Sequence, residues 1–72
     1  MTHQLQAYKV YFRHRHSRRT FVWTRLAQNE QAVRESTQRD LNAEFSPDTP
    51  VITAVIPVYW SDDVGKFVTV PV

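Results

Sequence analysis

The 72-residue sequence predicts a single α+β domain over residues 1–72, in which an antiparallel sheet carries one amphipathic helix on one face. Three observations predict this class. Two N-terminal segments alternate with a period of two, which is typical of strands. The stretch from Glu30 to Phe45 contains neither Gly nor Pro, which favours a helix. Two further apolar segments follow a proline-rich break, so the predicted order is ββαββ.

The first two segments are expected to form a hairpin. In residues 5–13, Tyr8, Val10 and Phe12 fall on one face, and in residues 20–26, Phe21 and Trp23 share a side. The polar residues 14–19 between them are short enough for a hairpin connection. Pairing of Phe12 with Phe21 and of Val10 with Trp23 would give the hairpin one aromatic, apolar face.

The helix is expected to begin after Asn29, whose side chain can cap the first turn, with Glu30 placed favourably for the helix dipole. Ser46, Pro47 and the residues up to Pro50 should end it, because the residue before a proline avoids helical conformation. Residues spaced by four form an apolar stripe, and two acid-first i,i+4 pairs should stabilise the solvated side. The stripe is Val33, Thr37, Leu41 and Phe45, and the pairs are Glu30–Arg34 and Glu35–Arg39.

Residues 51–60 are apolar on both faces, which predicts a central strand. Simple alternation places Val51, Val55 and Tyr59 on one face and the even-numbered residues from Ile52 to Trp60 on the other. Pro57 removes a ladder donor, so the strand is expected to change partner there. Residues 61–66 should form a turn with Gly65 at positive φ, and residues 67–72 a last short strand.

Composition limits the compartment and the chemistry. The chain has no cysteine, which excludes disulfides, thiolate metal sites and a cysteine nucleophile and fits a reducing cytoplasm. Residues 1–20 are polar and basic, unlike a signal peptide, and no apolar run approaches the roughly 18 residues of a membrane span. We therefore expect a cytoplasmic protein with no membrane partner.

Charge is distributed unevenly along the chain. Residues 1–28 hold six basic side chains and no acid, whereas residues 29–72 hold three basic side chains and seven acids. Guanidinium groups suit phosphates and carboxylates because their planar fork binds two oxygens, and nearby aromatic rings could stack on bases. The alternative is a solvated loop that maintains solubility. The predicted anion-binding or partner-binding residues are Lys9, Tyr11, Arg13, Arg15, His16, Arg18, Arg19, Trp23 and Arg25.

Other chemistry is weakly represented. His14 and His16 share a strand face but make only two metal ligands, and the flanking arginines repel a cation, so we expect no metal and no cofactor. Asp62 and Asp63 fit an ordinary turn, and no nucleophile or phosphate-loop motif is present, so we expect no enzyme activity. Trp60 is expected in the core more than on the surface.

The chain resembles short ββαβ proteins encoded by phages and plasmids, which include anti-CRISPR inhibitors of nucleic-acid-guided complexes. The segments that carry the resemblance are residues 8–12, the basic turn, residues 21–24, the helix start at 29–32 and the strand at 51–58. It implies a stoichiometric binder in a host bacterial cytoplasm, acting on an acidic protein surface of a nucleoprotein complex. Direct binding of nucleic acid and self-association as a structural subunit remain alternatives, and the protein would be a monomer or a homodimer.

Overall fold

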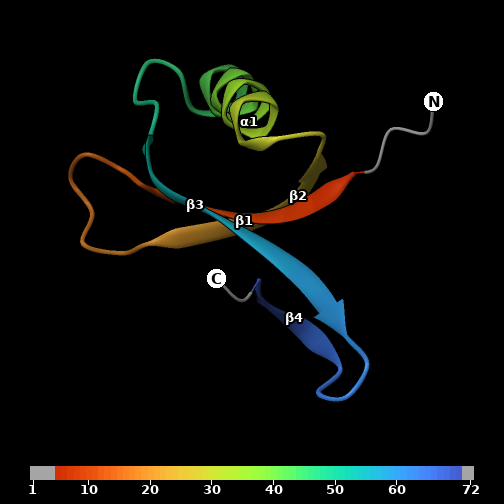
Figure 1. The fold of residues 1–72 in the computed structure, drawn as a ribbon. Helices are drawn as coiled ribbons and strands as arrows, with labels where there is room; N and C mark the ends of the chain where they lie inside the picture. Colours follow the sequence, from red (N-terminus) through yellow and green to blue (C-terminus); the bar gives the residue numbers. More distant parts are fainter. Residues whose placement is uncertain (1–4, 71–72) are drawn as a thin grey trace.

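A computed structural model describes residues 5–70 and confirms the α+β class (Figure 1). Four antiparallel strands form one sheet in the order β2-β1-β3-β4, and the single helix covers one face of it. The elements are β1 (Gln6–Arg13), β2 (Phe21–Ala27), α1 (Glu30–Phe45), β3 (Val51–Ser61) and β4 (Lys66–Thr69). No helix within this described range is long and apolar enough to cross a bilayer.

The first hairpin has the predicted register, with Phe12 opposite Phe21 and Val10 opposite Trp23. The Phe12 and Trp23 rings meet edge to face with centroids 4.9 Å apart, and Phe12 also stacks on Phe21 at 5.8 Å. Such aromatic pairs contribute about 0.5–1.5 kcal/mol beyond their buried area. The hairpin therefore presents an aromatic surface to the helix, as the alternation predicts.

The helix begins and ends where the sequence predicts. The Ala32 N–H donates to the Asn29 side-chain oxygen at 2.8 Å, and Ser46 is the C-cap. Its buried residues are Val33, Thr37 and Leu41, and Val33 packs in the core cluster with Tyr8, Val10 and Val55 of the sheet.

The Glu30–Arg34 pair forms at 3.7 Å. The expected Glu35–Arg39 pair does not form, because the Glu35 carboxylate accepts a hydrogen bond from Gln31 instead.

The face assignment of β3 is wrong at its first residues. The register against β1 shifts between Tyr11 and Phe12, so that Phe12 lies opposite Ile52 while Tyr11 lies opposite Ala54. The bulge leaves Thr53 unpaired, and its hydroxyl donates to the Tyr11 carbonyl. One extra residue inverts the alternation before it. Ile52 therefore joins Val55 on the helix side, and Val51 lies on the opposite face.

The sheet has one face that the helix does not cover, which we call the open face. It consists of Ala7, Lys9, Tyr11 and Arg13 of β1 and the residues paired with them, including Val22 and Leu26 of β2 and Ile56 and Val58 of β3. None of its residues is acidic. It is largely apolar, and Leu26 at its edge is 64% exposed and Val22 48%, whereas Ala7 and Val58 in its middle are buried.

The end of β3 continues past β1 and pairs only with β4. Val58 lies opposite both Ala7 and Thr69, and the Val70 N–H donates to the Pro57 carbonyl, so the change of partner predicted at Pro57 occurs there. We call residues 59–69 the arm; Figure 1 shows it projecting away from the helix. Gly65 has φ of 65° in its turn, as predicted. The expected last strand ends at Thr69, and residues 71–72 lie outside the described residues.

Candidate functional site: a basic loop at one end of the sheet

The loop between β1 and β2 carries the densest positive charge of the molecule. Its turn is closed by the Ser17 N–H donating to the His14 carbonyl at 3.1 Å and by the Arg19 N–H donating to the Ser17 hydroxyl at 3.0 Å. The side chains of Arg15, His16, Arg18 and Arg19 are exposed. The local hydrogen bonds therefore order the backbone while the guanidinium groups remain in solvent. We call residues 14–20 the basic loop.

His14 anchors this loop to the fold. Its ring meets Phe45 edge to face at 4.9 Å and Phe21 at 5.7 Å, so one loop residue packs against both the helix end and β2. A depression of about 300 Å³ lies next to it, lined by residues 14–17 and Asp48. Asp48 is the acid that faces this part of the loop.

The loop cations are not neutralised by ion pairs. Within residues 5–70, the ion pairs are Arg25–Asp40 and Arg34–Glu30. Arg13, Arg15, Arg18 and Arg19 therefore have no carboxylate within 4 Å in this part of the chain. Like charges at such density repel one another, and an anion bound among them would relieve that repulsion.

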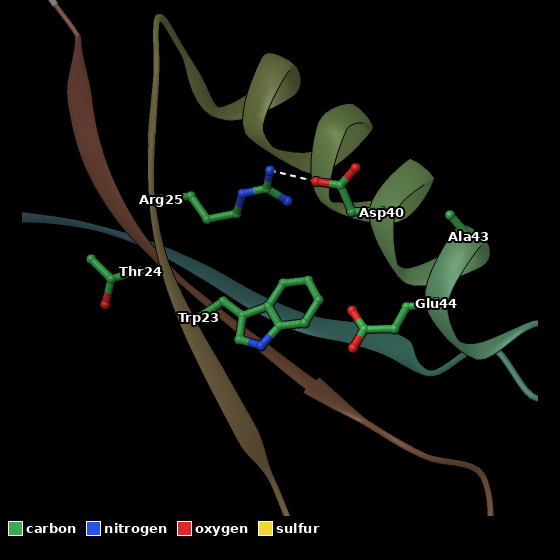
Figure 2. Close-up of a pocket in the computed structure, with 6 residues that line it drawn as sticks. All are labelled: Trp23, Thr24, Arg25, Asp40, Ala43 and Glu44. Atoms are coloured by element: carbon green, nitrogen blue, oxygen red, sulfur yellow. Dashed lines mark hydrogen bonds and ion pairs between the residues drawn. The ribbon is translucent and has the colours of Figure 1, made fainter.

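Two of the predicted site residues lie away from the loop. Trp23 and Arg25 point from β2 toward the helix, whereas Thr24 points away (Figure 2). The Arg25 guanidinium donates to Asp40 at 2.5 Å and to the Thr37 hydroxyl at 3.4 Å, and it lies 6.0 Å from the Trp23 ring. Arg25 therefore fastens the helix to the edge strand, and its charge is already compensated.

These side chains line an open groove of about 560 Å³ between β2 and α1. Its other walls carry Asp40, Ala43 and Glu44. Two carboxylates against one guanidinium give the groove a net negative charge, which disfavours an anion. The structure thus separates Trp23 and Arg25 from the loop arginines in space and in charge.

Lys9, Tyr11 and Arg13 occupy the open face of β1, and Tyr11 and Trp23 therefore lie on opposite faces of the sheet. They do not form one stacking platform. Arg13, at the end of β1, is exposed and adjoins the basic loop, whereas Lys9 and Tyr11 are half-buried further along the strand. Of the nine predicted residues, the structure gathers Arg13, Arg15, His16, Arg18 and Arg19 at one end of the sheet.

The expectation that Trp60 lies in the core is wrong. Trp60, expected in the core, is 54% exposed, and Tyr59 is 46% exposed, because β1 ends before it reaches them. The Trp60 ring meets Phe67 edge to face at 5.3 Å, and its indole N–H donates to Asp62 at 3.1 Å. The apolar character of β3 on both faces was the available signal, since such a strand requires cover on both sides.

Across residues 5–70 no cluster of three or more His, Cys, Asp or Glu side chains could hold a metal ion. Comparisons of the chain with protein-family models, with curated proteins and with solved structures found no match.

Proposed function

We propose that this protein is a small non-enzymatic binding module whose basic loop engages an anionic partner. The observation that carries the proposal is the group of exposed, unpaired guanidiniums of Arg15, Arg18 and Arg19 on a loop that local hydrogen bonds order. An ordered loop loses less conformational entropy when it binds, so its charge contributes more to affinity.

The charge distribution supports an acidic protein surface as the partner. Positive charge is concentrated at one end of the molecule, while residues 29–72 carry seven acids against three basic side chains. An extended polyanion that continued over the helix would meet its exposed acids Glu30, Glu35 and Glu44. A compact acidic patch of matching size would contact the loop alone.

The positions of Trp23 and Tyr11, the two rings of the predicted site, support the same choice. Binding of single strands relies on bases stacking on exposed rings beside basic side chains. Here Trp23 packs against Phe12 on the helix side, and Tyr11 lies on the open face, so neither ring adjoins the loop tip. The proposed role is that of an inhibitor or accessory factor that docks on an acidic patch of a nucleic-acid-processing complex, as an anti-CRISPR-like protein would.

The test compares two kinds of anion in fluorescence-polarisation titrations. Labelled polyglutamate peptide and labelled single- and double-stranded oligonucleotides are titrated at low and physiological salt. The variant is R15E/R18E/R19E, and the matched control, R34E/R39E/K66E, makes the same change in charge away from the loop. We expect the native protein and the control to bind polyglutamate, and the loop variant to lose binding at least about tenfold.

Two results would contradict the proposal. Absence of polyglutamate binding, or binding that the loop variant retains, would remove the loop as the working surface. Oligonucleotide binding that persists at physiological salt, with a log–log salt slope of about −0.7 to −0.9 for each phosphate contacted, would instead establish a direct nucleic-acid module.

A further inference from the structure

The arm presents an apolar surface that nothing in the described chain covers. Trp60 and Phe67 lie on its open-face side, and Tyr59 lies on the other. A hairpin that pairs with no third strand is marginally stable in water, and apolar side chains on both its faces require a packing partner. The same face of the sheet exposes Val22 and Leu26 on β2 and part of Ile56, while Val58, between Trp60 and Ile56 on β3, is buried.

Charge at the two ends of this surface identifies a partner. The only charged residues on the open face are the cations Lys9 and Arg13. The turn at the tip of the arm carries the acids Asp62 and Asp63, while Lys66, opposite Ser61, lies on the other face of the arm. A molecule whose apolar surface is basic at one end and acidic at the other complements an inverted copy of itself. Two copies in the same orientation would instead oppose like charges.

The strand register allows this inversion. Asp62 lies four residues beyond Val58, in the turn that follows the end of β3 at Ser61. In the other direction, Lys9 and Arg13 lie two and six residues beyond Ala7, the β1 partner of Val58. Ala7 and Val58 are themselves buried, so the contact would be made by the exposed residues on either side of their row. A two-fold axis along this row brings the tip of each arm over the stretch between Lys9 and Arg13 of the other copy, about 13 Å from the axis at 3.3 Å per residue.

We propose that the open face is a homodimer interface, in which the arm of each copy lies across the open face of the other. Trp60 then packs on apolar side chains of the second sheet, and Asp62 and Asp63 pair with Lys9 and Arg13. The basic loop is not required for this contact.

Sedimentation velocity over roughly two decades of micromolar concentration tests the proposal. We expect a monomer–dimer equilibrium that D62K/D63K and K9E/R13E each weaken by at least about tenfold, because each opposes like charges in the interface. The combined variant, which exchanges the two sets of charges, should restore dimerisation to within a few fold of the native value. E35K/E44K, which makes the same charge change on the helix, should dimerise normally.

A second readout does not depend on the charge variants folding. In a Trp23→Phe background, Trp60 is the single tryptophan, and its emission should shift to shorter wavelength and resist acrylamide quenching as concentration rises. A native protein that remains monomeric over the whole range would overturn the proposal. So would a dimer that the exchanged variant fails to restore, or a dimer in which Trp60 stays solvated. R15E/R18E/R19E should dimerise normally, which separates this proposal from that of the basic loop.

Discussion

The two hairpins of this sheet end at opposite edges of the molecule and differ in both stem and tip (Figure 1). The stem of the β1–β2 hairpin is covered by the helix, with Val10 and Phe12 buried, and its tip is basic. The stem of the arm is bare, with Trp60 and Tyr59 half-exposed, and its tip carries Asp62 and Asp63. The first hairpin packs against the helix, whereas the second has no packing partner among residues 5–70.

This difference shows how little the net charge of +2 conveys about the surface. Each tip has its own sign, and each lies at a different distance from the core. A charged tip on a packed stem suits contact with a separate partner. A charged tip on an apolar stem suits an interface in which burial supplies affinity and charge sets orientation.

The largest loss of stability is expected from a substitution in the core between the helix and the sheet. Leu41 is fully buried on the helix, so Leu41→Ala removes buried methyl groups and leaves a cavity. We expect a loss of about 2–5 kcal/mol in the free energy of unfolding, measured by urea denaturation. The control Arg39→Ala, on the exposed side of the same helix, should change it by less than about 0.5 kcal/mol. Equal effects of the two variants would mean that the helix does not pack as described.

A smaller loss of unfolding free energy is expected from truncating a tryptophan, and it should differ between the two hairpins. Trp23 packs on Phe12 beneath the helix, whereas Trp60 contacts Phe67 on the bare arm. In dilute solution, Trp23→Ala should cost about 2–3 kcal/mol of unfolding free energy and Trp60→Ala about 0.5–1.5 kcal/mol. At high concentration the cost of Trp60→Ala should grow, because the native protein then gains stability from dimerisation. A larger cost for Trp60 than for Trp23 in dilute solution would reverse the comparison.

The smallest effect concerns the basic tip. Arg15, Arg18 and Arg19 are exposed and form no ion pair with any residue of the described chain. Replacing all three by alanine should leave the free energy of unfolding within about 0.5 kcal/mol of the native value, or raise it slightly by relieving repulsion. A thermal-denaturation series at low and high salt measures this. A loss above about 1 kcal/mol would show that the loop arginines support the fold.

The first hairpin and the helix could be predicted because their signals are local. Alternation predicted the two faces of the hairpin, and the pairing of Phe12 with Phe21 that it suggested is the observed one. Asn29, followed by Glu30, marked the helix start. The bulge at Thr53 shifted the faces of β3, because one inserted residue inverts alternation and no residue type announces it. The Arg25–Asp40 pair and the exposure of Trp60 depend on long-range packing, so the sequence pattern assigned Arg25 to the basic surface and Trp60 to the core.

The measurement that tests the separation of the two tips most directly is the dimer dissociation constant of R15E/R18E/R19E beside that of D62K/D63K, by sedimentation velocity. We predict that the loop variant dimerises like the native protein and that dimerisation of the arm variant is weakened by at least about tenfold. Equal weakening of both, or weakening of the loop variant alone, would contradict the assignment of different partners to the two ends of the sheet.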